Sequence, residues 1–267
     1  MIRVRATSGA NESLKRARRL LKYPRLCRRT GTTLAEGLHL AGELCKHPEL
    51  IRTIFIREGA DRNHELRAVL GKLEHLNIYL LELPAAHFAS ICPVENGAGI
   101  VCEISTPVPQ EQVGHGDIVF LDGVSDPGNA GSIIRLSLAA GVSTIAVSDQ
   151  CAYIWGPKVL RAGMGAHFFC RFIFGKSLKS IKEESGNQCL VADARGGKDL
   201  FAENWGERPT IWVFGNEGAG VSQDSLQNSD ITLLIPIDRR VESLNVASAA
   251  SVCLFEQRRR RLLKSAT

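Results

Sequence analysis

The chain has 267 residues, of which 44% are hydrophobic, and a net charge of +5. This length suits two domains of ordinary size, and the apolar content excludes a disordered chain. No apolar run approaches the roughly 20 residues that span a bilayer, and the charged N-terminus lacks the apolar core of a secretory signal. We therefore expect a cytoplasmic protein without a membrane segment.

The cysteines and histidines give no indication of a metal site. The eight cysteines are scattered without a C-x-x-C pair, and the seven histidines show no paired spacing. Reduced thiols in the core are therefore expected, rather than a disulfide framework or a bound metal.

Charge is segregated along the chain. Residues 1–30 carry ten Lys or Arg and one Glu, residues 256–267 carry five and one, and the segment between them has a net charge of −8. Positive charge collected at both ends of an otherwise acidic chain favours a polyanion partner, such as a nucleic acid, over two merely solvated helix faces.

The first hundred residues alternate short helices and strands. Residues 11–22 form a predicted basic helix with Leu14, Ala17 and Leu21 on one face, and residues 34–46 a second helix. The elements expected next are a strand at 51–57, a helix at 62–73, a strand at 78–83, a short helix opened by Pro84, and a strand at 99–104. This order predicts a compact α/β domain over residues 1–104.

The stretch 105–116 is the best candidate linker, since it holds two prolines and shows no hydrophobic periodicity. Residues 117–267 then repeat a strand–helix pattern. Strands are expected at 118–121, 144–147, 168–174, 189–192, 210–214 and 231–235, with helices at 130–140, 157–162, 178–184 and 243–262. Buried-looking strands separated by helices predict a parallel sheet covered on both faces.

Three loops that follow strands of this second domain hold the polar residues suited to chemistry. The first offers Asn129 as a helix N-cap, Gly131 for close backbone approach, and Arg135, whose guanidinium suits a phosphate or carboxylate. The second is Gly-rich, but its G-x-x-G-x-G spacing and its late position argue against a dinucleotide fold. Its residues are Gly215-Asn216-Glu217-Gly218-Ala219-Gly220.

The third loop is the segment 235–248, which leaves the last strand. Pro236 removes a backbone donor, so the strand ends there or lies at an edge. Ser243 and Asn245 stand where a helix begins and its N–H groups lack partners. A strand end that turns into a helix N-terminus is a natural ligand site.

Together the three loops resemble the SpoU (TrmH-type) RNA ribose 2′-O-methyltransferases of the SPOUT superfamily. The motifs occur in the family's order as Asn129-x-Gly131-x-x-x-Arg135, Phe214-Gly215-Asn216-Glu217-Gly218-x-Gly220, and Ile235-Pro236 followed by Ser243-Leu244-Asn245-Val246. Near the N-terminus, Leu34-Ala35-Glu36-Gly37-Leu38-His39-Leu40 is similar to the E-G signature of the family's small RNA-binding domain. Residues 88–101 are similar to that domain's last helix and strand, and the first ten residues fall outside the resemblance.

The resemblance implies a C-terminal parallel-sheet methyltransferase domain with a trefoil knot, preceded by a smaller α/β RNA-binding domain that resembles ribosomal proteins. It implies S-adenosylmethionine as the methyl donor, bound inside the knot. The cofactor-binding positions would be Gly215, Gly218, Ile235, Ile237 and Leu244. The catalytic and substrate-positioning set would be Asn129, Arg135, Glu217, Ser243 and Asn245.

Two of these roles have alternatives. The attacking ribose hydroxyl must lose a proton, and no histidine lies in the motifs. Arg135 either activates the hydroxyl or, as we expect from an arginine pKa above about 12, clamps phosphate and ribose. Glu217 either accepts the proton or, as we favour, orients the Gly-rich loop.

The resemblance also implies partners. Family members are homodimers, and the face formed by Ala247, Ala249, Ala250, Val252 and Leu254 suits either such an interface or the domain's own core. RNA backbone would be bound by the run Arg258–Arg261 and by the basic N-terminal positions Lys15, Arg16, Arg18, Arg19, Arg28 and Arg29.

Ribosomal RNA is favoured over transfer RNA as the substrate, and a catalytically inactive RNA-binding member is the remaining alternative. One turn departs from the family pattern, because Asp238-Arg239-Arg240 stands where small residues are usual. This bulkier charged turn either touches RNA or alters cofactor entry.

Overall fold

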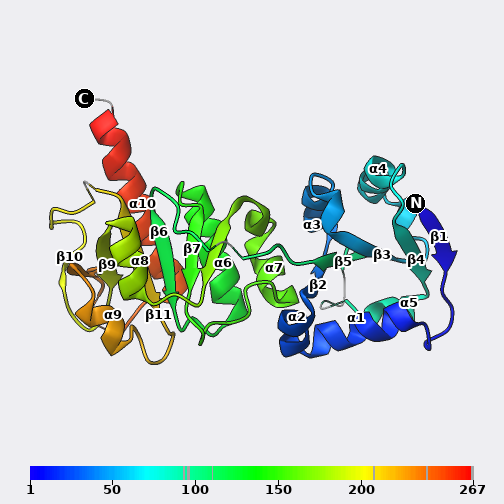
Figure 1. Cartoon of the computed structure of the whole chain (residues 1–267), viewed down its shortest axis with the longest axis horizontal. Helices are drawn as coiled ribbons and strands as arrows, with labels where there is room; N and C mark the ends of the chain where they lie inside the picture. The colour runs from blue at the N-terminus through cyan, green and yellow to red at the C-terminus, as the bar shows by residue number, and fades with distance from the viewer. Residues whose placement is uncertain (93, 95–96, 110, 207, 239, 266–267) are drawn as a thin grey trace. The chain divides into compact units, whose positions relative to one another are not determined.

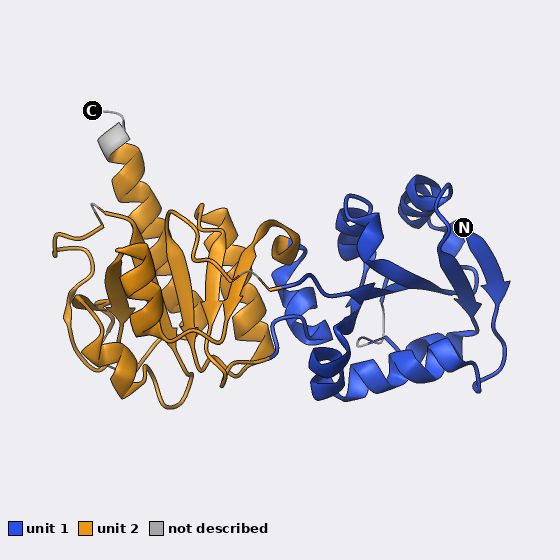
Figure 2. Cartoon of the chain, in the orientation of Figure 1, with its two compact units in different colours: residues 1–108, 153–165 blue, residues 109–152, 166–267 orange. Residues whose placement is uncertain are grey.

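The computed structural model describes residues 1–92, 94, 97–109, 111–206, 208–238 and 240–265. The chain forms two compact units, one of residues 1–108 and 153–165 and one of residues 109–152 and 166–267 (Figure 2). The segment 153–165 therefore packs with the first unit, although the sequence placed all of 117–267 in one domain.

Unit 1 is a five-stranded mixed sheet with helices on both faces (Figure 1). The sheet order is β1-β4-β3-β5-β2, and only β5 runs antiparallel to its neighbours. Its elements are β1 (Ile2–Arg5), α1 (Glu12–Lys22), α2 (Pro24–Thr30), β2 (Thr32–Glu36), α3 (Leu38–Leu44), η1 (Pro48–Leu50), β3 (Ile51–Arg57), η2 (Ala60–Arg62), α4 (His64–Leu73), β4 (Tyr79–Leu83), α5 (Ala85–Ala89), β5 (Ile100–Ser105) and α7 (Pro157–Gly163).

The helix predicted over residues 34–46 is wrong in its first part. Thr32–Glu36 is a fully buried strand that pairs with β5, and only Leu38–Leu44 is helical. Gly37 separates the two with a φ of 105°, a conformation that other residues rarely adopt. On α1 the deepest contacts come from Leu14, Ala17 and Leu20, whereas Leu21 is only half-buried. Strand β1 was not predicted.

Unit 2 confirms the predicted parallel α/β sheet. Its seven strands lie in the order β10-β12-β9-β11-β6-β7-β8, and every neighbouring pair is parallel. Its elements are β6 (Ile118–Asp122), α6 (Pro127–Ala139), β7 (Thr144–Val147), η3 (Ala166–Phe169), β8 (Arg171–Phe174), α8 (Leu178–Ser185), β9 (Gln188–Ala192), β10 (Lys198–Asp199), β11 (Thr210–Gly215), α9 (Gln223–Gln227), β12 (Ile231–Leu234) and α10 (Val246–Ser265).

Both faces of this sheet are buried over its central strands, because most positions of β6, β7, β9 and β11 are apolar. On one face, Phe120 and Val213 form a core with Leu178 and Ile181 of α8. On the other, Trp212 donates its ring N–H to Gln257 of α10, which also packs along α6. Continuous hydrophobic strands of this kind are typical of sheets covered on both sides.

The strand order brings the segments after β9, β11 and β12 to the same edge of the sheet. The chain runs outward from β6 through β7 to β8, and then returns on the other side of β6 as β9, leaving a space that β11 fills. Strand β12 follows beyond β9. Because all these strands are parallel, the segments after β9, β11 and β12 leave from the same edge of the sheet, where α/β proteins bind ligands.

Within the described residues, no helix combines the length and apolarity needed to cross a membrane. All eight cysteines are free thiols, and burial raises the pKa of Cys102 to about 12. Such thiols stay protonated and behave as small apolar core groups.

Candidate active site

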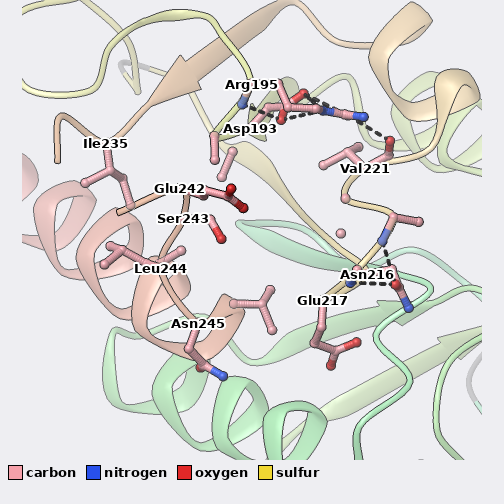
Figure 3. Close-up of a pocket in the computed structure, with 18 of the residues that line it drawn as sticks. Asp193, Arg195, Asn216, Glu217, Val221, Ile235, Glu242, Ser243, Leu244 and Asn245 are labelled. Carbon is pink, nitrogen blue, oxygen red and sulfur yellow. Dashed lines mark hydrogen bonds and ion pairs between the residues drawn. The ribbon is translucent and has the colours of Figure 1, made fainter. Parts of the chain in front are cut away.

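A cleft of about 750 Å³ lies in unit 2 at the carboxyl ends of β9, β11 and β12 (Figure 3). Its walls come from residues 192–195, residues 215–221, and residues between Leu233 and Ala249. Eight predicted site residues line it: Gly215, Glu217, Gly218, Ile235, Ile237, Ser243, Leu244 and Asn245. Asn129 and Arg135 do not.

The Gly-rich turn forms one wall and requires glycine at its start. A Cβ on Gly215 would lie 2.4 Å from the backbone carbon of Gly220, so no other residue fits. Reciprocal backbone hydrogen bonds of 2.9 Å between Asn216 and Gly220 close the turn. The Asn216 side chain accepts from the N–H groups of Gly218 and Ala219, at 2.9 Å each. The turn is therefore rigid before any ligand arrives.

Asn129 joins the three loops. Its Nδ2 donates to Oε1 of Glu217 at 3.0 Å, and its Oδ1 accepts from Nδ2 of Asn245 at 3.0 Å. Asn245 in turn accepts the backbone N–H groups of Ala247 and Ser248, as an N-cap of α10 does. The side-chain amides of Asn129 and Asn245 each have one consistent orientation, because this series of hydrogen bonds begins at a carboxylate and ends at backbone donors.

The predicted N-cap of the first loop was wrong. Asp126 caps α6 by accepting the N–H of Asn129 at 2.8 Å, and Asn129 lies inside the first turn. Pro127 at the first helical position explains the earlier start, since its fixed φ and missing N–H suit that position. Because Asn129 lies inside α6 rather than at its N-cap, its side chain does not cap the helix and instead links Glu217 and Asn245.

Glu217 is held as an ionised acceptor. It receives the backbone N–H groups of Asp126 and Ser125, the Ser125 hydroxyl and the Asn129 amide, at 3.0 to 3.3 Å. Desolvation opposes ionisation, but these hydrogen bonds outweigh it and lower the pKa of Glu217. A carboxylate with its acceptor positions filled is a weak base, so this geometry favours orientation of the Gly-rich loop.

Within the part of the chain that the structure describes, the side chains of Arg135 and Ser243 have no hydrogen-bond partner. Arg135 is exposed on α6 and makes no hydrogen bond or ion pair with another described residue. Ser243 is exposed on the third loop, and Figure 3 shows its hydroxyl directed toward the middle of the cleft. Both side chains are available to a substrate.

Three charged residues of the cleft were missed from the sequence. Asp193 and Arg195 form an ion pair of 2.9 Å after β9, and Arg195 also donates to the carbonyl of Val221. Although burial opposes it, hydrogen bonds from Arg195 lower the pKa of Asp193. Glu242 lines the third loop. The first two could have been found from their place directly after a buried parallel strand.

The basic N-terminal positions divide into fixed and free side chains. Arg16 pairs with the buried Glu103 at 2.6 Å, and Arg18 donates to Ser90 at 2.8 Å. Lys15 pairs with Glu12, and the Arg28 guanidinium lies 5.4 Å above the Tyr153 ring. The exposed arginines of this segment that have no hydrogen bond, ion pair or ring contact with a described residue are Arg19, Arg25 and Arg29.

The turn that departs from the family pattern, Asp238-Arg239-Arg240, is described in part. Asp238 and Arg240 form an exposed ion pair of 2.9 Å, and Asp238 accepts the N–H of Val241 through its carbonyl. Arg239 lies outside the described residues. The described part of the chain holds no group of three or more His, Cys, Asp or Glu arranged to bind a metal.

The parallel sheet, the Gly-rich turn and the linked loops form the kind of domain that the motif resemblance implies, a methyltransferase domain. Residues 117–255 match the model of the SpoU rRNA Methylase family, more than half of the chain. The chain therefore belongs to this family, as the motif resemblance predicted.

Characterised relatives extend the match beyond that domain. The 23S rRNA (guanosine(2553)-2′-O)-methyltransferase RlmP of Bacillus subtilis is 29% identical over 86% of this chain and 90% of its own. The 23S rRNA (guanosine-2′-O-)-methyltransferase RlmB of Neisseria meningitidis serogroup B is 29% identical over 86% and 96%. The AdoMet-bound rRNA methyltransferase from Sinorhizobium meliloti superposes with a TM-score of 0.83 at 25% identity, over 97% and 98% of the two chains.

Proposed function

We propose that this protein transfers a methyl group from S-adenosylmethionine to a ribose 2′-hydroxyl of ribosomal RNA. The observation that carries the proposal is the pair of hydrogen bonds that joins Asn245 to Asn129 and Asn129 to Glu217. These bonds link the three family motifs at the cleft. The proposal is supported by relatives of nearly full length whose names describe ribose methylation of 23S rRNA.

The cleft fits the methyl donor in size and in backbone chemistry. A volume of about 750 Å³ lies within the range of sites for small molecules. At Gly215 a Cβ would collide with the backbone of Gly220, so the turn that forms this wall of the cleft requires glycine there. Ile235, Ile237 and Leu244 would supply apolar surface and backbone groups for the adenine, with Gly218 beside them. When bound, the donor supplies an activated methyl group on a sulfonium.

The protein's own residues then position the attacking oxygen. We assign Arg135 to clamp phosphate and ribose, because its fork of donors is exposed and uncommitted. Glu217 holds the Gly-rich turn against α6 rather than accepting the proton. Asn129 and Asn245 fix the distance between the loops, and Ser243 offers a hydroxyl to the reacting ribose. Positioning of this kind supplies much of the rate in a displacement reaction.

We further propose that unit 2 carries a trefoil knot closed by the segment 235–245. Two features support this: β11 is inserted between β9 and β6, and β12 then crosses to the far side of β9. We also propose that the region predicted as residues 1–104 is an RNA-binding domain, with Arg19, Arg25 and Arg29 as its available cations. A cytoplasmic location fits such a substrate.

A homodimer is proposed on the exposed face of α10. Ala250 and Leu254 are buried in the core of unit 2, so they are not available to a partner. Ala247, Ala249 and Val252 are half-buried, and Phe255 is 43% exposed. An aromatic residue beside small side chains suits close helix packing. Light scattering of the purified protein tests this assembly.

Mapping of ribose methylation tests the function. Total RNA from a strain lacking this gene should lose one 2′-O-methylated nucleotide of ribosomal RNA that the parent carries. Loss of a transfer RNA site instead would move the substrate to that class. An unchanged map, with no heat of binding for S-adenosylmethionine in calorimetry, would leave the inactive RNA-binding alternative.

A further inference from the structure

Among the described residues, four charged side chains line the cleft, and three of them are already engaged. Asp193 and Arg195 neutralise each other across 2.9 Å. Glu217 accepts four hydrogen bonds, three from the loop after β6 and one from Asn129 in the first turn of α6. A carboxylate offers about four acceptor positions, so Glu217 has no position left for a ligand.

Glu242 is the fourth charged residue and differs from the others. It lies on the third loop directly before Ser243, is exposed, and makes no hydrogen bond or ion pair with another described residue. Figure 3 shows its carboxylate directed toward the middle of the cleft, on the same side as the Ser243 hydroxyl. Leu244, the next residue, points the other way.

We propose that Glu242 binds the positive charge of the methyl donor. This inference rests on the proposed function, because S-adenosylmethionine carries a sulfonium and an α-ammonium group and the cleft has no other uncommitted carboxylate among the described residues. The contact stabilises the bound donor before the reaction. It is therefore expected to change the affinity for the donor more than the rate of the chemical step.

Three ligands that differ in their cationic groups distinguish a contact of Glu242 with the ammonium from a contact with the sulfonium. S-adenosylmethionine has both, S-adenosylhomocysteine keeps only the ammonium, and 5′-methylthioadenosine has neither. A contact with the ammonium predicts that Glu242→Gln weakens binding of the first two ligands. A contact with the sulfonium predicts weaker binding of the first alone. In both cases binding of the uncharged ligand is unchanged.

Calorimetry on the full chain measures these affinities. We expect Glu242→Gln to weaken S-adenosylmethionine binding about three- to tenfold, and Glu242→Lys to weaken it further, with both effects shrinking as salt is raised. Glu183→Gln is the control, because it removes one exposed negative charge from α8 of unit 2 at a residue that does not line the cleft. This control should bind all three ligands like the unaltered protein.

Two results would overturn the inference. One is an unaltered affinity of Glu242→Gln for S-adenosylmethionine. The other is an equal loss for 5′-methylthioadenosine, which would indicate a change in cleft shape rather than in charge. Failure of the unaltered protein to bind S-adenosylmethionine would instead reject the proposed function, and the role of Glu242 with it.

Discussion

The two arginine-rich segments of this chain have similar compositions and different structures. Both were expected to bind the RNA backbone. In α10, every guanidinium of Arg258–Arg261 has a partner inside unit 2. On α1 and α2 of unit 1, Arg16 and Arg18 are fixed, whereas Arg19, Arg25 and Arg29 are free of described partners.

Arg260 illustrates how completely the C-terminal run is used. Its guanidinium pairs with the buried Glu256 at 2.8 Å and lies 4.3 Å above the Trp205 ring. It also donates to the carbonyls of Leu200 and Glu203, at 2.8 Å each. Beside it, Arg261 donates to Asp117 at 2.8 Å. A run of arginines in the sequence therefore does not show whether their side chains are available to RNA until their neighbours in the fold are known.

Arg135 represents a third situation, a single exposed arginine on α6 that does not line the cleft. We expect Arg135→Lys to lower kcat/KM for RNA about a hundredfold or more, because lysine cannot reproduce the planar fork of donors. Transfer of a labelled methyl group to RNA measures this. Arg62→Lys, at an exposed site of unit 1, should keep full activity. Near-normal activity of Arg135→Lys would reject the clamp.

Removing Arg260 should destabilise the fold strongly. Arg260→Ala removes hydrogen bonds to Glu256 and to the carbonyls of Leu200, Phe201 and Glu203, together with the contact with the Trp205 ring. We expect a loss of about 3 kcal/mol in the free energy of unfolding, measured with urea. Arg19→Ala is the control, since this exposed side chain makes no hydrogen bond or ion pair with a described residue. Equal effects of the two would contradict a structural role for Arg260.

The same cluster predicts an acid dependence of stability. Hydrogen bonds from Arg259 and Arg260, opposed by desolvation, lower the pKa of Glu256 to about 2 from an ordinary value of 4.5. The unfolded chain binds this proton first, so the contribution is complete above about pH 4.5 and disappears as the pH falls toward 2. We expect about 2 kcal/mol. Urea unfolding of Glu256→Gln should converge with the unaltered protein at low pH, and a constant difference would refute the assignment.

The smallest effects are expected on α1 and α2. Arg19→Ala, Arg25→Ala and Arg29→Ala should each weaken RNA binding about two- to threefold, and the triple variant should reduce the salt dependence of binding by about two to three counterions. Filter binding at several salt concentrations measures both. Arg259→Ala should leave affinity and salt dependence unchanged. The opposite outcome would mean that the C-terminal run binds RNA despite its internal partners.

The sequence was sufficient to predict the site as three separate loops, because each loop is defined by residues close together along the chain. The Gly-rich turn after β11 and the Asn245 cap of α10 follow from local rules on glycine and helix termini. The sequence could not predict the bond between Asn129 and Glu217, which are 88 residues apart. Nor could it assign Asp193 and Arg195 to the same cleft, because their neighbours come from distant strands.

By itself the sequence determined the repeated βα pattern of unit 2, its largely apolar central strands and the motifs that place the chain in the SpoU family. These depend on periodicity and short spacing, which local physics controls. Tertiary structure alone decided that Thr32–Glu36 is a strand, which arginines are free, and that Glu242 points into the cleft. Each of these depends on partners far along the chain, and a side chain's availability is set by those partners.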